Sequence, residues 1–248
     1  VNVFLGMAIY AMVLFVWGSE YIPTKNLKYG IYADEIGQTI GLKNGDKILE
    51  IGGEKVEKFN DIQLKILLEE KNTITIERDG SRQNIQVPQS TLAEVIKQQQ
   101  SFIEPAVIPL VDLVVANSPA EKAGLLKGDR ILKINESETP FFQDVVKTLQ
   151  TVKNLSVELL VLRNGSETTL EASVSAEGTL GFAIQPMNEQ LVFEKQKYGL
   201  LESIPAGINK AYDSFDNYIK QIKLIFRPET EAYKSLGGFL TIGKAFSP

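Results

Sequence analysis

The chain has 248 residues, 44% hydrophobic and 23% charged, which is typical of a globular protein with room for about two domains. A net charge of −5 without a basic run argues against a nucleic-acid partner. The absence of histidine and cysteine excludes Ser-His-Asp and Cys-His catalysis, disulfides, and zinc sites built on these ligands. The chain alone is therefore a poor candidate for an enzyme, and we expect no cofactor in it.

The first seventeen residues carry no charge, and Tyr10 and Trp17 suit a membrane interface. As a helix this run would reach about 26 Å, close to the roughly 30 Å of a bilayer core. We therefore expect residues 1–18 to form part of a transmembrane helix. A cleavable signal peptide and a buried soluble helix are the alternatives.

One motif occurs twice, as Gly41–Ile51 and as Gly124–Ile134, with its Gly, Leu, Gly, Asp, Ile, Leu and Ile positions identical. Each copy predicts a glycine-ended helical turn, a tight Gly-Asp turn and a short buried strand. We expect the turn residues to maintain the fold rather than to contact a ligand. They are Gly45, Asp46, Gly128 and Asp129.

A second match follows each copy, with Asp79-Gly80 and Asn164-Gly165 as the hairpin turns. Each repeat therefore predicts a strand, a short helix, a strand, a helix, a strand, a hairpin and a strand. We assign residues 29–88 to a first domain and 101–187 to a second. A linker helix is expected over 89–100, with Ser90 as its cap.

The segment from Ser203 to Phe226 predicts an amphipathic helix within the range 200–227, with Ser203 as its cap. Its apolar side chains fall on one face: Ile204, Ile208, Ala211, Tyr212, Phe215, Ile219, Ile222 and Phe226. Two interpretations are open. The helix docks on its own domain, or it lies at a membrane surface or on a membrane-embedded partner.

The run Ser118–Leu125, followed by Gly128–Leu132, resembles the circularly permuted PDZ domain of bacterial proteases. The resemblance implies an α+β fold of two tandem permuted PDZ domains, which are small, partly open β-barrels with two helices each. The transmembrane-like helix and the amphipathic helix would flank them.

PDZ domains bind peptide ends by adding a strand to an open sheet edge, with a loop of backbone amides receiving the carboxylate. By resemblance, the loop of the first domain is Tyr29, Gly30 and Ile31. That of the second is Phe102, Ile103, Glu104 and Pro105. The second loop lacks the glycine of the hydrophobic-Gly-hydrophobic pattern, and Glu104 would repel a carboxylate.

The order of segments resembles the site-2 protease family of membrane zinc metalloproteases, in the branch that cleaves anti-sigma factors. Residues 237–244 line up with its Ser-Gly-Pro-x-x-Ile motif, and 228–248 would be the Gly-rich segment leading to the next membrane helix. In this family a His-Glu-x-x-His helix and an Asp-Gly motif hold the zinc. Neither motif is present in this chain, so the resemblance implies zinc in a longer parent protein.

The resemblance implies a substrate-filtering and recognition region on the periplasmic side of the bacterial inner membrane. Its partners would be single-pass membrane proteins or their C-terminal ends, the parent's membrane segments, and a membrane surface contacted by 203–226. The alternative is a membrane-anchored PDZ scaffold without protease activity, such as a secretion-system component. An HtrA-like serine protease would need a histidine.

Overall fold

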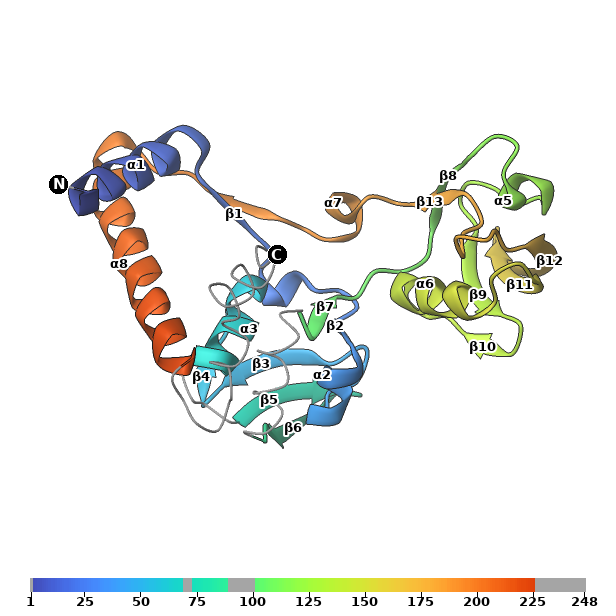
Figure 1. Ribbon diagram of the computed structural model, residues 1–248, viewed down its shortest axis with the longest axis horizontal. Helices are drawn as coiled ribbons and strands as arrows, with labels where there is room; N and C mark the ends of the chain where they lie inside the picture. Colours follow the sequence, from blue (N-terminus) through green and yellow to red (C-terminus); the bar gives the residue numbers. More distant parts are fainter. Residues whose placement is uncertain (1, 69–72, 89–100, 226–248) are drawn as a thin grey trace, which may run out of the picture. The chain divides into compact units, whose positions relative to one another are not determined.

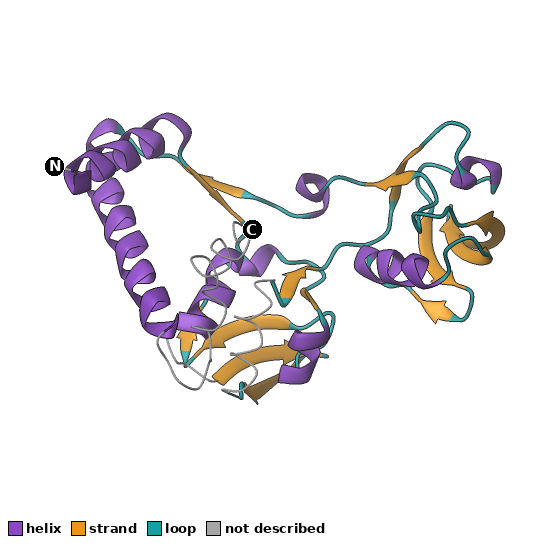
Figure 2. Ribbon diagram, viewed as in Figure 1, coloured by secondary structure: helices purple, strands orange, loops and turns teal. Residues whose placement is uncertain are grey.

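The computed structural model describes residues 2–68, 73–88 and 101–225, which form two compact units (Figure 1). Unit 1 comprises residues 1–26, 33–104 and 193–248, and unit 2 comprises residues 27–32 and 105–192. Both are mixtures of helices and strands (Figure 2). Each unit is built around a four-stranded sheet.

The sheet of unit 1 has the strand order β4-β3-β5-β6, and all three of its strand pairs are antiparallel. Its buried face is made by isoleucines of the repeat and of the strand after it, including Ile51, Ile74 and Ile76. The elements around this sheet are α2 (Glu35–Ile40), β3 (Lys47–Ile51), β4 (Glu54–Lys55), α3 (Phe59–Leu68), β5 (Thr73–Arg78) and β6 (Ser81–Gln86). The paired strands β2 (Ile31–Ala33) and β7 (Ile103–Pro105) include residues of both units, because Ile31, Tyr32 and Pro105 belong to unit 2.

Unit 2 repeats this order, with a four-stranded antiparallel sheet β10-β9-β11-β12 and a separate ladder of β13 with β8. Its core joins Val145 and Leu149 of one helix to the inner face of the sheet. The elements are β8 (Val111–Val114), α5 (Pro119–Lys122), β9 (Arg130–Ile134), β10 (Ser137–Glu138), α6 (Phe142–Thr151), β11 (Ser156–Arg163), β12 (Ser166–Ser173), β13 (Phe182–Ile184) and α7 (Met187–Gln190).

The buried aspartate of each repeat holds its turn in the same way. In unit 2, Asp129 accepts hydrogen bonds from Leu126 N at 2.8 Å and from Arg163 Nε and Nη2 at 2.8 and 2.7 Å. The same Nη2 donates to Gly124 O at 2.8 Å. Asp46 and Arg78 repeat this arrangement in unit 1. One bidentate ion pair therefore ties the turn to the hairpin strand in each unit.

The hairpin prediction is confirmed, because Asn164 and Gly165 have φ of 51° and 82°, as a type I′ turn requires. Asp79 and Gly80 have φ of 52° and 74°. Residues 101–104 belong to unit 1, and the predicted domain bounds 29–88 and 101–187 stay a prediction. The predicted linker helix at 89–100 and the Gly-rich segment 228–248 lie outside the described residues.

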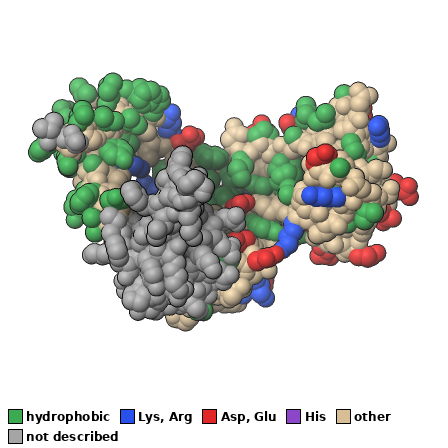
Figure 3. Space-filling model, viewed as in Figure 1, with side chains coloured by type: hydrophobic (Ala, Val, Ile, Leu, Met, Phe, Trp, Pro, Cys, Tyr) green, Lys and Arg blue, Asp and Glu red, His purple; other side chains and the backbone are tan. Residues whose placement is uncertain are grey.

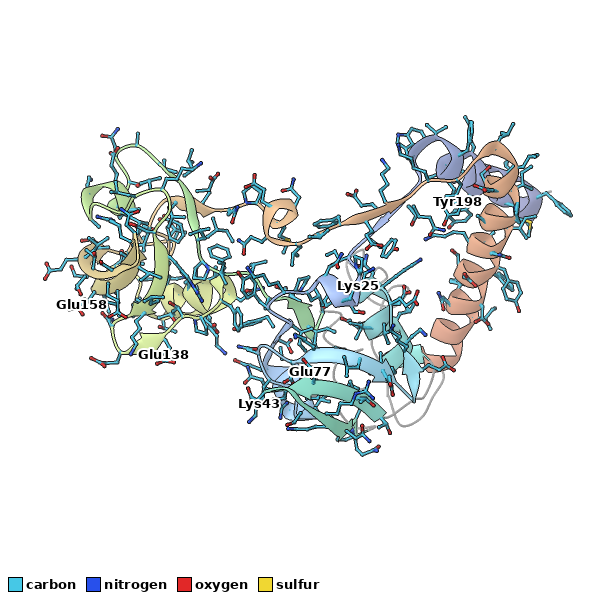
Figure 4. All side chains as sticks on the ribbon, turned by 180° about the vertical axis from the view of Figure 1, so that it is seen from behind. Lys25, Lys43, Glu77, Glu138, Glu158 and Tyr198 are labelled. Atoms are coloured by element: carbon cyan, nitrogen blue, oxygen red, sulfur yellow. The ribbon has the colours of Figure 1, made fainter. Side chains whose placement is uncertain are left out.

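Unit 1 also contains a helix pair, α1 (Asn2–Trp17) and α8 (Leu200–Ile225). A short ribbon, β1 (Ser19–Tyr21) with β14 (Glu194–Gln196), adjoins the pair and is followed by the 3-10 turn η1 (Thr24–Asn26). Lys25 of η1, labelled in Figure 4, has its Nζ 3.2 Å from Oε1 of Glu194 in β14.

The predicted cap of α8 is wrong, because the helix begins at Leu200, before Ser203. Ser203 is buried inside the helix, and its hydroxyl donates to Leu200 O at 2.8 Å. The N-terminus is instead closed by Glu202, whose carboxylate accepts from Gly199 N at 2.9 Å. Of the predicted range, Phe226 lies outside the described residues.

Small residues of α8 face α1. A Cβ added to Gly207 would lie 2.5 Å from Ala11 N, and Tyr10 Oη lies 3.3 Å from Ser214 Oγ. The apolar face of α8 is exposed, with Ile204 51% and Phe215 62% accessible. The helix therefore docks through small residues and not through its apolar face.

Within the described residues, no helix combines the length and the apolar character that a membrane crossing requires. The transmembrane assignment of residues 1–18 is therefore not confirmed. Hydrophobic side chains gather over α1 and α8, as Figure 3 shows.

Candidate functional site

The candidate site lies in unit 2, at strand β13. This strand pairs on one side with β8, where Val115 N donates to Gly181 O at 2.9 Å and Gln185 N donates to Leu110 O at 2.8 Å. Because the C=O and N–H of a trans peptide point in opposite directions, Phe182 N–H and Ile184 C=O point away from β8. In the described part of unit 2 no second strand pairs with this edge. It can accept an added strand.

A glycine-containing loop leads into β13. Ala120 N donates to Leu180 O at 2.8 Å, and Val115 N donates to Gly181 O. These two carbonyls are therefore used within the unit, and the N–H groups of Gly181 and Phe182 point the other way. Gly181 has a φ of 82°, which brings neighbouring N–H groups toward one side. Successive backbone donors of this kind suit a carboxylate.

Helix α6 forms the wall beside β13. The ring of Phe142 packs edge-to-face on Phe182 with centroids 6.4 Å apart, and both side chains border the core. Val146, one turn later on the same face, is 43% exposed. An extended peptide added to β13 would place alternate side chains against this apolar wall.

The end of α6 fixes the loop. Gln150 Nε2 donates to Glu177 O at 3.1 Å, and a Cβ on Gly178 would lie 3.0 Å from Lys153 Cε. The pKa of Glu177 is lowered by hydrogen bonds from its own backbone and from Ser175, with a smaller contribution from the charge of Lys153. The turn at Glu177 and Gly178 therefore lies beside the cation of Lys153 and contains the ionised carboxylate of Glu177.

The start of α6 is fixed by Asp144, whose carboxylate accepts from Phe141 N at 3.1 Å. Burial raises the pKa of Asp144, and hydrogen bonds from Phe141 N and from Tyr32 oppose this rise. The position of α6 beside β13 is thus set at both ends of the helix.

Unit 1 has a counterpart between α3 and β7, with a cavity of about 390 Å³. The described residues that line it are all neutral, and they are Phe59, Asn60, Gln63, Leu64, Ser101 and Ile103. Within the described residues, no group of three or more His, Cys, Asp or Glu side chains is placed to hold a metal ion.

The two loops named from the sequence lie side by side, because β2 pairs with β7 and Ala106 N donates to Gly30 O at 3.1 Å, but within the described residues no groove or loop of amides is built from them together. Tyr29 and Gly30 precede β2, and Ile31 begins it. Phe102 is fully buried, Ile103 lines the cavity of unit 1, and Glu104 and Pro105 complete β7. Peptide binding by any of them stays a prediction.

Sequence reasoning missed Leu180, Gly181 and Phe182 as a loop. The signal was present, because these residues have the hydrophobic-Gly-hydrophobic pattern and lead into a short apolar strand. They follow the hairpin of their own repeat, whereas the loop was sought before each repeat. The turn residues Gly45, Asp46, Gly128 and Asp129 lie in the aspartate-held turns described above.

Comparison with known proteins identifies a PDZ domain within unit 2. Residues 110–163 match the family model described as a PDZ domain. The regulator of sigma E protease of Haemophilus influenzae is 28% identical, over 80% of this chain and 47% of its own length. A putative zinc metalloprotease of Borreliella burgdorferi is 32% identical, over 50% of this chain and 28% of its own.

A further putative zinc metalloprotease, from Treponema pallidum, is 25% identical over 76% of this chain and 42% of its own length. The chain spans less than half the length of each of these relatives. It contains a PDZ domain and is related over much of its length to these proteins, which confirms the resemblance to the site-2 protease family of zinc metalloproteases.

Proposed function

We propose that this chain is the substrate-recognition region of an intramembrane-cleaving zinc metalloprotease, and that unit 2 captures the C-terminal end of a partner polypeptide. The observation that carries the proposal is the open edge of β13 next to outward N–H groups of Gly181 and Phe182. An added strand would pair with β13, and its terminal carboxylate would accept hydrogen bonds from the loop.

The relatives support the setting. Zinc belongs to the parent protein, whose tandem PDZ region faces the periplasm from the bacterial inner membrane. Single-pass membrane proteins of the anti-sigma-factor type are its substrates. The exposed apolar side chains of α1 and α8, with Trp17 at 61% and Leu201 at 81%, support contact with a membrane surface or with the parent's membrane segments.

Peptides with a free C-terminal carboxylate should bind unit 2 more tightly than the same peptides with an amidated terminus. A charge-assisted hydrogen bond contributes about 1.5–3 kcal/mol, so we expect at least about a tenfold difference in Kd. Titration of the full chain, followed by the amide resonances of residues 178–184, measures it. Equal affinity for both forms would refute capture of the carboxylate.

In the parent protein, the recognition region would also act as a filter, because folded bodies above the membrane exclude partners that keep a large ectodomain. Deleting residues 105–192 should increase cleavage of an untrimmed substrate relative to a trimmed one. Cleavage assays in membranes carrying the parent protein measure this ratio. An unchanged ratio contradicts the filter, and a parent without any cleavage activity favours a scaffold.

A further inference from the structure

The cavity of unit 1 differs from the groove of unit 2 in charge. None of the six described side chains that line it is ionisable, and their polar groups are the amides of Asn60 and Gln63 and the hydroxyl of Ser101. A carboxylate buried here would lose its hydration without a cation to replace it. A neutral side chain meets apolar walls from Phe59 and Ile103.

The outer edge of β7 is closed to an added strand. Asp34 N donates to Phe102 O at 3.1 Å, so Ile103 N–H points away from the partner strand. The next outward residue is Pro105, which has no N–H, and the outward carbonyl of Ile103 already accepts from Ser101 Oγ at 2.6 Å. Within β7, Ile103 N–H is the one outward donor, and one donor does not make a ladder.

Phe102, the residue before β7, is held close to α2. Phe102 is fully buried, and Gly37 of α2 lies so close that a Cβ there would be 2.6 Å from Phe102 O. In unit 2 the glycine is in the loop itself, as Gly181. Neither of the described residues before β7, Ser101 and Phe102, has the positive φ that turns backbone donors toward a ligand.

We propose that the α3–β7 cavity of unit 1 binds a single uncharged, apolar side chain from an internal segment of a partner polypeptide, without strand addition and without a terminal carboxylate. This inference rests on the proposed function, because it assigns a ligand class to the second groove of the same recognition region. Unit 2 would then bind the C-terminal end of a substrate, and unit 1 would bind a side chain from its interior.

Two small probes test the cavity in the full chain. N-acetyl-leucinamide should shift the amide resonances of Gln63, Leu64 and Ile103, and N-acetyl-leucine, which carries a carboxylate, should shift them at least about tenfold less at equal concentration. The substitution Leu64→Asn should remove the response while leaving residues 178–184 unchanged. Equal shifts from both probes, or no shift from the amide, would overturn the inference.

A variant that restores the hydrogen-bonding groups at the outer edge of β7 tests whether that edge is closed in the native chain. An acetylated and amidated heptapeptide of alternating threonine and valine should perturb β13 but not β7 in the native chain. The variant Ser101→Ala/Pro105→Val frees the Ile103 carbonyl and restores an N–H, so β7 should then respond. If the heptapeptide shifts the amide resonances of native β7 as much as those of β13, the edge of β7 is open. If the folded double variant shows no new shifts at β7, the two substituted groups do not close that edge.

The experiments distinguish failure of the function proposed for unit 2 from failure of the inference about the unit 1 cavity. If neither the heptapeptide nor a free carboxylate perturbs β13, unit 2 does not capture peptides. The preference of the unit 1 cavity for the amide over the acid is still measured by the two leucine probes.

Discussion

Replacing Asp129 with asparagine is expected to lower the free energy of unfolding of unit 2 by about 3 kcal/mol. Removing one partner of a buried ion pair costs about 3–5 kcal/mol. The side chain of Asp129 is 1% exposed and that of Arg163 is 26% exposed, so water partly compensates the remaining cation and the lower end applies. Asparagine keeps only one acceptor oxygen, so its NH2 group would face either Arg163 Nε, which donates to Oδ1, or the Oδ2 donors Leu126 N and Arg163 Nη2.

Hydrogen exchange of the β11 amides measures this loss within unit 2, because these amides exchange through opening of its sheet. The matched variant Asp46→Asn should destabilise unit 1 and leave β11 unchanged. Asp112→Asn is the control, since its 2.6 Å pair with Lys127 has side chains 36% and 75% exposed. Equal effects of Asp129→Asn and Asp112→Asn would contradict a structural role for the buried pair.

The order of elements in each unit could be predicted because it depends on local signals. Each signal depends on only a few neighbouring residues: the Gly-Asp turns, the Asn164-Gly165 turn and the spacing of apolar residues. The structure contains the turns and strands that these signals predict. The two three-residue strands β7 and β13 could not be assigned in this way. Their partners β2 and β8 lie about seventy residues earlier in the chain. The sequence of a three-residue strand does not indicate which distant strand it pairs with.

The helix α8 shows a second limit of sequence patterns. Its apolar face was correctly identified, but the pattern did not say what that face contacts. The contact with α1 is set by close backbone approach at Gly207, which a hydrophobic pattern does not register. Pairing through small residues leaves Ile204, Tyr212 and Phe215 exposed, which favours the second of the two interpretations, a surface for a membrane or a membrane-embedded partner.

Replacing Gly181 with alanine should weaken binding of a free-carboxylate peptide to unit 2 by at least about tenfold, or about 1.4 kcal/mol. Two effects combine. A φ of 82° strains any residue with a Cβ, and that Cβ would lie 2.4 Å from Ser118 Cβ. Relief of the contact moves either the loop or Ser118, whose hydroxyl accepts from Glu121 N at 3.2 Å. Either movement misaligns the outward N–H groups.

Gly165→Ala separates strain from contact, because Gly165 has the same φ of 82° but no atom within 4 Å of an added Cβ. It should cost about 1 kcal/mol of stability and leave peptide affinity unchanged. Peptide titration and thermal unfolding of both variants give the two quantities. A loss of affinity in Gly165→Ala as large as in Gly181→Ala would mean that general destabilisation accounts for it. If only Gly181→Ala loses affinity, the loop before β13 holds the peptide end, and the close approach to Ser118 is what fixes that loop.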